Sequence, residues 1–65
     1  MHSIQKHEFE LLVNKLRPPN NWVMKQHNFA RTGMMVCEYQ REENGTVIFR
    51  TEHKANGMTY YWSAL

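Results

Sequence analysis

Cysteine is almost absent from this chain, because Cys37 is the single example among 65 residues. One cysteine cannot close an intramolecular bridge, so the sequence excludes the disulfide-stapled scaffolds that are common among small secreted domains. Long hydrophobic runs are also lacking, since the longest extends only from Met34 to Cys37. That run is too short for a membrane span or for the apolar centre of a secretion signal. We therefore expect a cytoplasmic protein that does not contact membranes.

A marked excess of one charge is lacking as well. Eight Lys and Arg residues stand against six Asp and Glu residues, which gives a formal net charge of +2. Dedicated nucleic-acid-binding domains normally carry a larger basic excess. Internal repeats and linker-like segments are missing too. A chain of this size buries only about 60% of the surface that its unfolded state exposes, which leaves room for one small core. The sequence predicts one small domain that spans residues 1–65.

The N-terminal segment has the spacing of an amphipathic helix. Ser3 is the expected N-cap, and Pro18-Pro19 cannot continue a helix. A helix over residues 4–16 would place four apolar side chains on one face, namely those of Phe9, Leu12, Val13 and Leu16.

Two Asn-Gly steps, Asn44-Gly45 and Asn56-Gly57, mark tight hairpin turns, because these residues accept the positive φ that such turns require. Together with a turn at Ala30 to Gly33, they predict strands over 22–29, 34–42, 46–53 and 58–64. The first strand has Lys25, Gln26 and His27 at its centre, which is typical of an edge strand that discourages unwanted strand addition. The expected fold is α+β, with one N-terminal helix packed on a four-stranded antiparallel β-meander. Its expected core consists of Phe9, Leu12, Val13, Leu16, Cys37, Tyr39, Val47 and Phe49.

Turn length sets the register of each hairpin. For the first Asn-Gly step, a three-residue loop with Gly45 in the left-handed conformation pairs Glu42 with Thr46 and sorts apolar side chains onto one face. This register also places Glu38 opposite Arg50. For the last hairpin two registers stay open. A two-residue turn puts Trp62 on the core face and Tyr61 outside, whereas a bulged turn reverses the two and brings Trp62 over Arg50.

One short helix can cover only one face of such a sheet. The other face would carry an apolar centre ringed by charged residues, a composition typical of protein-binding surfaces and dimer interfaces. The leading hypothesis is a non-enzymatic protein-interaction module, of the kind found among accessory and regulatory proteins of bacteria and phages. Its partner would be another protein, including a second copy in a homodimer, bound through the exposed face or edge of the sheet. The candidate interaction residues are Val36, Ile48, Arg50, Tyr61 and Trp62.

Nucleic-acid binding is the alternative from a different functional class. Basic and aromatic side chains near the helix end, the first strand and its following turn are able to contact phosphates and stack on bases. The residues of this basic and aromatic patch are Arg17, Trp22, Lys25, His27 and Arg31.

Catalytic and metal sites have little support in the sequence. His2 and His7 would point apart on a helix, and no second cysteine accompanies Cys37, so neither a metal nor another cofactor is expected. A thiol enzyme would have to use Cys37 with His53, which are diagonal neighbours on one face in the chosen register. A small ribonuclease would have to use His53, Arg50, Glu52 and Tyr60, again without a diagnostic motif. The prediction is therefore a protein that is not an enzyme.

Overall fold

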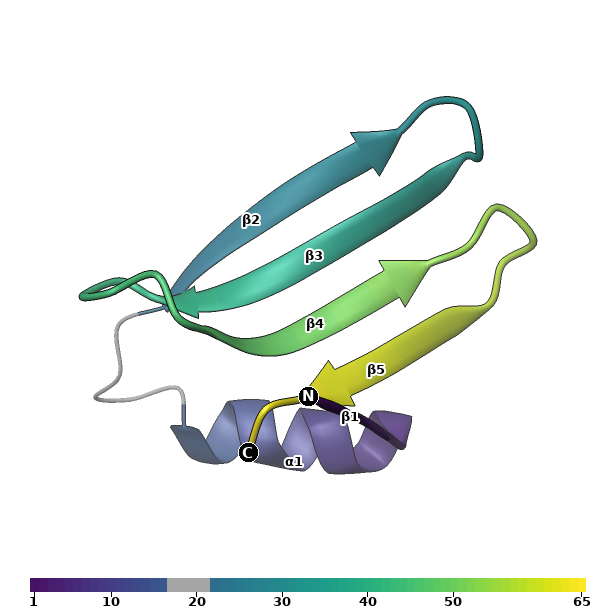
Figure 1. Ribbon diagram of the computed structural model, residues 1–65. Coiled ribbons are helices and arrows are strands. Elements are labelled where there is room, and N and C mark those ends of the chain that lie inside the picture. Colours follow the sequence, from purple (N-terminus) through teal and green to yellow (C-terminus); the bar gives the residue numbers. More distant parts are fainter. Residues whose placement is uncertain (17–21) are drawn as a thin grey trace.

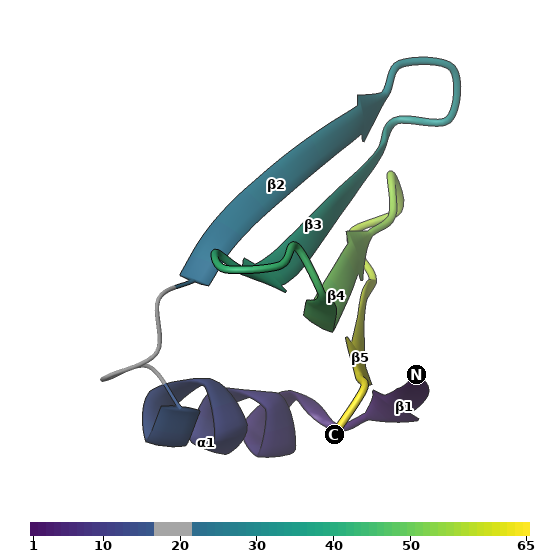
Figure 2. The same ribbon diagram turned by 60° about the vertical axis from the view of Figure 1, so that its left-hand side comes forward.

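The computed structural model describes residues 1–16 and 22–65. One helix and five strands follow in the order β1 (His2–Ile4), α1 (Lys6–Leu16), β2 (Trp22–Phe29), β3 (Met34–Arg41), β4 (Val47–His53) and β5 (Thr59–Ser63). All neighbouring strands are antiparallel, in the sheet order β1-β5-β4-β3-β2. The helix lies against one face of this sheet (Figures 1 and 2). The predicted α+β class is confirmed, while Pro18-Pro19, expected to end the helix, lies outside the described residues.

The N-terminus forms a strand that the sequence analysis did not predict. His2, Ser3 and Ile4 pair with Ser63, Trp62 and Tyr61 along the outer side of β5. The helix then begins at Lys6, and the Phe9 amide donates to the Gln5 carbonyl at 3.0 Å. The expected N-cap at Ser3 and the count of four strands are therefore wrong. Strand pairing prevails here because it satisfies backbone groups of β5 that would otherwise lack partners in the sheet.

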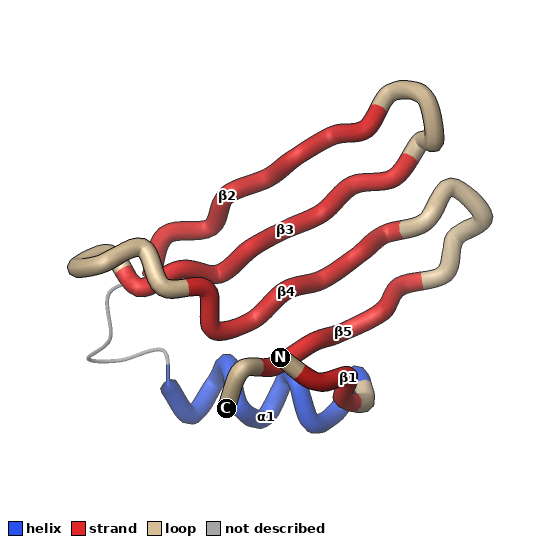
Figure 3. The backbone as a smooth tube through the Cα atoms, viewed as in Figure 1, coloured by secondary structure: helices blue, strands red, loops and turns tan. Residues whose placement is uncertain are grey.

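The β3–β4 hairpin has the expected register over most of its length but a different loop (Figure 3). Glu38 lies opposite Arg50, as predicted. Glu42 does not pair with Thr46, because the Arg41 amide donates to the Thr46 carbonyl at 2.9 Å and closes a loop over residues 42–45. Gly45 has the expected left-handed conformation, with a φ of 70°.

A register shift between Tyr39 and Gln40 reconciles this longer loop with the rest of the hairpin. Gln40 lies opposite Val47, and Ile48 is the additional residue of a β-bulge on β4. Ile48 is consequently buried in the core cluster beside Phe49. The expectation that Val47 would occupy the core is therefore wrong, since the bulge gives that position to Ile48.

The β4–β5 hairpin adopts the bulged turn, which settles the register that the sequence left open. The Lys54 amide donates to the Met58 carbonyl at 2.8 Å, and Gly57 has a φ of 90°. Trp62 consequently lies opposite Arg50, and Tyr61 lies opposite Thr51. Tyr61 packs against the core under the helix, while Trp62 faces the other way.

Phe9 is the centre of the core between α1 and the sheet. Its ring makes edge contacts with Tyr39 and Phe49, at centroid distances of 5.7 and 5.6 Å, and a tilted contact with Tyr61 at 5.0 Å. Such edge and tilted arrangements are the favourable geometries for aromatic pairs. The helix is therefore held to the sheet mainly through one aromatic side chain, with the partly buried Leu12, Val13 and Leu16 packed around it.

Trp22 fixes the start of β2 to this core. Its ring stacks on Phe49 at 5.4 Å with an interplanar angle of 8°, and it meets Tyr39 edge-on. The indole Nε1 donates to the carbonyl of Leu16 at 3.2 Å, which ties the strand to the last turn of the helix. These contacts position β2 as the far edge of the sheet.

Candidate functional site

The two edges of the sheet differ in length and regularity. One edge is the three-residue β1, whereas the other is the eight-residue β2. The pairing of β2 with β3 runs without a register shift from Trp22 to Phe29, and residues 24–29 are all exposed. Within the described ranges 1–16 and 22–65, no strand pairs with the outer side of β2. We call this outer side the β2 edge.

Backbone alternation shows which residues of β2 have free hydrogen-bonding groups. The carbonyl of Phe29 accepts from the Gly33 amide at 2.9 Å, so the backbone of Phe29 is directed toward the following turn and β3. Successive residues of an antiparallel strand direct these groups to opposite sides. The outward groups of the β2 edge therefore belong to Met24, Gln26 and Asn28.

An apolar hollow lies beside the β2 edge on the side of the helix. It has a volume of about 190 Å³ and is lined by Val13, Trp22, Met24 and Tyr39. Met24 lies opposite Tyr39 in the sheet and is 50% exposed. We call this hollow the Met24 groove. A side chain from an added strand would reach it directly, because Met24 belongs to the edge strand itself.

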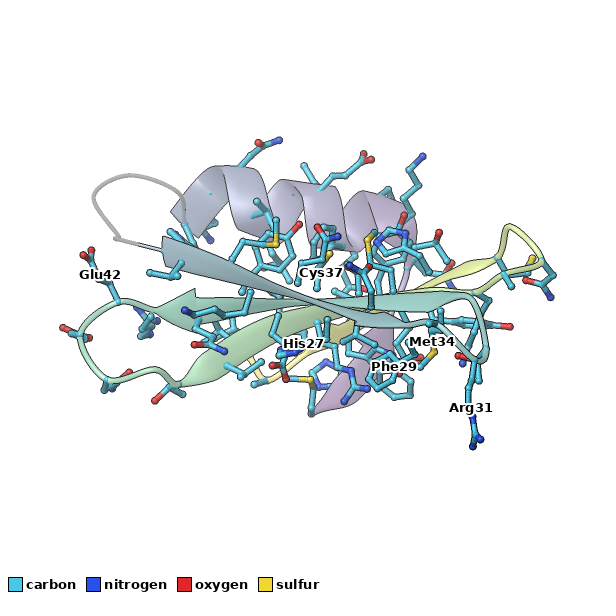
Figure 4. The ribbon with its side chains drawn as sticks, turned by 90° about the horizontal axis from the view of Figure 1, so that it is seen from above. His27, Phe29, Arg31, Met34, Cys37 and Glu42 are labelled. Carbon is cyan, nitrogen blue, oxygen red and sulfur yellow. The ribbon has the colours of Figure 1, made fainter. Side chains whose placement is uncertain are left out.

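The opposite face of the same edge is basic. Lys25, His27 and Arg31 are all exposed, and Figure 4 shows His27 and Arg31 on the side of the sheet away from the helix. His27 Nε2 lies 3.3 Å from Glu38 Oε1. Lys25 is opposite Glu38 in the register but makes no ion pair with any other described residue. On the helix side the edge thus presents the apolar Met24 groove followed by the polar Gln26 and Asn28, whereas on the other side the basic Lys25 and His27 are followed by the exposed Phe29.

Two of the residues that the sequence predicted for an exposed apolar patch on the sheet face away from the helix are buried. Val36 retains only 3% of its exposure and Ile48 only 4%, so the expectation that both would be exposed is wrong. Ile48 belongs to the core through the bulge. Val36 lies opposite Glu52, whose carboxylate binds Arg50 at 3.5 Å and Lys54 at 3.2 Å. The ion pairs of Glu52 thus lie on this face of the sheet beside the buried Val36.

Of the remaining predicted interaction residues, the structure brings two together. Arg50 and Trp62 are cross-strand neighbours on the face away from the helix, whereas Tyr61 lies on the helix side. Both Arg50 Nε and Trp62 Nε1 are buried without a hydrogen-bond partner among the described residues. Phe29 and Tyr60 are the large aromatic residues exposed on this face.

The residues of the basic and aromatic patch are divided by the fold. Arg17 lies outside the described residues, and Trp22 is committed to the core by its stacking on Phe49. Only Lys25, His27 and Arg31 are exposed together, on β2 and the turn that follows it. The stacking group that a nucleic-acid site would need is therefore not supplied by Trp22.

Cys37 and His53 share the helix side of the sheet, as the register predicted, but no hydrogen bond between them occurs in the described part of the chain. The His53 ring nitrogens instead lie 3.1 Å from the Thr51 hydroxyl and 3.3 Å from the Thr59 hydroxyl. Cys37 is buried, and Figure 4 shows it on the helix side of the sheet. This arrangement orients the imidazole but leaves neither of its nitrogens directed at the thiol.

The residues considered for a ribonuclease are separated by strand alternation. Arg50, Glu52 and Tyr60 lie on the face away from the helix, while His53 lies on the helix side.

Among residues 1–16 and 22–65, no three His, Cys, Asp or Glu side chains gather as metal ligands would. Burial, followed by the nearby Cys37 and Tyr61, raises the pKa of the Tyr39 phenol above 10.0.

Sequence reasoning missed Met24 and Gln26 as site residues. Strand alternation within 22–29 was the available signal, because it separates Met24 and Gln26 from Lys25 and His27 once the strand is known to be an edge. The Met24 groove was not foreseeable in this way, since it also needs the position of Val13 on α1.

Comparison with known proteins gave no relative: no family model, no curated protein and no solved structure matches this chain. In the described segments, no helix has the length and apolar content needed to cross a membrane. A function must therefore be argued from the geometry of the sheet and its edge.

Proposed function

We propose that this protein is a non-enzymatic interaction module that binds an extended segment of another polypeptide along the β2 edge. The observation that carries the proposal is the regular eight-residue edge strand, whose outward backbone groups have no strand partner among residues 1–16 and 22–65. In strand addition, main-chain hydrogen bonds provide affinity and contacts with alternate side chains provide specificity. The Met24 groove and the basic side of β2 supply two such sets of side-chain contacts.

The edge is a better candidate than the face of the sheet away from the helix. On that face, Val36 is buried and the ion pairs of Glu52 occupy the centre. A partner docking there would have to strip water from these charges, which is costly unless each charge gains a new partner. Strand addition at the edge leaves the ion pairs undisturbed.

Proline at position 26 provides a direct test, because it removes one outward N–H of the β2 edge. Proline is tolerated on edge strands when the missing N–H would face solvent, so Gln26→Pro should leave the fold intact. Gln26→Ala is the matched control, since it removes the same side chain and retains the N–H. Circular dichroism and thermal unfolding would verify the fold of both variants.

Peptides that bind the wild-type protein would be selected from a displayed random library, and their affinities would be measured by calorimetry. The proposal expects selected peptides that bind wild type and Gln26→Ala alike and lose binding to a folded Gln26→Pro. Equal binding to Gln26→Pro, or failure to select any peptide, would contradict it. Light scattering on the same variants would identify the homodimer considered from the sequence, in which a second β2 takes the place of the peptide. Salt-sensitive retention of RNA or DNA without peptide binding would favour the nucleic-acid alternative.

A further inference from the structure

The two sides of the β2 edge have different chemistry, and this difference specifies the partner. Resting on the proposed strand addition, we infer that the bound segment alternates acidic with apolar side chains. Its apolar residues face α1 and its acidic residues face away from α1. The alternation follows from strand geometry, because successive side chains of an added strand point to opposite faces of the sheet.

The apolar requirement comes from the Met24 groove. An added strand places side chains beside Met24 on the helix side, where the walls are formed by Val13, Trp22 and Tyr39. Its volume of about 190 Å³ is several times the roughly 30 Å³ share of one water molecule, so a branched aliphatic side chain has room to enter. Burial of that side chain would also cover part of Met24, which is exposed in the free protein.

The acidic requirement comes from the opposite face. Strand β2 carries no Asp or Glu, and its exposed Lys25 and His27 are followed in the next turn by the exposed Arg31. On the neighbouring strand, Glu38 lies opposite Lys25 in the register, and its Oε1 lies 3.3 Å from His27 Nε2. Lys25 makes no ion pair with Glu38 or with any other described residue, so it is available for an acidic group on an added strand.

A second copy of the chain fits this edge less well. In a symmetric antiparallel pair of β2 strands, residues that share a face lie opposite each other. The two registers with the greatest overlap place Lys25 opposite either Lys25 or His27 of the other copy. The first of these registers sets two like charges against each other, which destabilises a strand pair, and in both registers Lys25 lacks the acidic neighbour that an acidic segment would supply.

Three end-blocked peptides, each matching the eight residues of β2 in length, test the inference. One alternates Glu with Leu, the second alternates Lys with Leu, and the third alternates Gln with Leu. Each is titrated against the wild type and against Lys25→Glu. Lys6→Glu is the matched control, because Lys6 is also exposed but is the first residue of α1, which follows the strand at the opposite edge of the sheet. Lys25→Gln serves in place of Lys25→Glu if circular dichroism shows that charge reversal disturbs the fold.

We expect the Glu peptide to bind wild type most tightly and to lose roughly tenfold in affinity to Lys25→Glu, with little change for Lys6→Glu. The Lys peptide should show the reverse preference. Equal affinity of all three peptides for wild type, or equal losses in Lys25→Glu and Lys6→Glu, would overturn the inference. If the peptides show either of these results but no longer bind Gln26→Pro, the proposed strand addition survives. If none of the peptides binds, or Gln26→Pro has no effect, the inference and the proposed function fail together.

Discussion

Replacing Phe9 by alanine should remove much of the stability of this domain, because one ring joins the helix to three aromatic residues of the sheet. Phe9 retains 8% of its exposure and contacts Tyr39, Phe49 and Tyr61 at centroid distances of 5.0 to 5.7 Å. Truncation deletes the buried ring and leaves a cavity that neighbouring aromatic side chains, fixed by their own strands, fill only in part.

The expected loss in the free energy of unfolding is about 3–5 kcal/mol, the usual range for a buried Phe→Ala substitution. For a domain of 65 residues, typical stabilities of about 0.05–0.15 kcal/mol per residue give a total of roughly 3–10 kcal/mol. The substitution therefore removes between a third and all of the stability. Leu11→Ala, on the same helix but 67% exposed, should change it by less than about 0.5 kcal/mol.

Urea unfolding followed by circular dichroism and tryptophan fluorescence would measure both losses, with Trp22 reporting on the core and Trp62 on the other face. The two variants introduce alanine into the same helix, so their difference isolates packing from helix propensity. Equal midpoints for Phe9→Ala and Leu11→Ala would refute the conclusion that Phe9 holds the helix to the sheet.

Two further predictions concern the core. Ile48→Ala should lower the free energy of unfolding in urea by about 2–5 kcal/mol, because the bulge buries Ile48. Val47→Ala should lower it clearly less, and the opposite order would contradict the bulge. The raised pKa of Tyr39 means that the folded state retains its phenol proton longer than the unfolded chain does. The contribution of the protonated Tyr39 phenol to the free energy of unfolding is thus intact below the unfolded pKa near 10.0 and is lost as the pH rises through the folded pKa. As the pH rises through this alkaline range, the free energy of unfolding measured in urea should fall less in Tyr39→Phe than in wild type. Equal falls in the two proteins would argue against a raised pKa of Tyr39.

Strand positions were predictable because turn chemistry in this chain is explicit. The expected strand over 22–29 is β2 without change, and Glu38 faces Arg50 as the apolar alternation required. Alternation over seven or eight residues leaves few acceptable registers, since a shift of one residue moves every side chain to the other face. The same constraint could not decide between Tyr61 and Trp62, because both are large aromatic residues that suit a buried face.

The N-terminal strand and the bulge were not predictable by these means. A segment as short as His2 to Ile4 has too few residues to show a period of two, and it becomes a strand only because β5 offers an edge nearby. The burial of Ile48 depends on one extra residue in the loop over 42–45 and on the compensating shift at Tyr39. Both features arise from pairing between distant segments, which local propensity does not encode.

The charged residues on the sheet face away from the helix pair with one another, whereas Lys25 on the edge strand β2 does not. In the sequence, Glu38, Arg50 and Glu52 alternate with apolar positions, and this pattern predicted a charged rim around an exposed centre. In the fold, Glu52 forms ion pairs with Arg50 and Lys54 on this face, and Val36 is buried. Lys25 lies on the outermost strand, makes no ion pair with another described residue and adjoins unpaired backbone groups. A lysine in that position repels strands of like charge, and in the strand addition that we propose the same side chain would favour an acidic partner.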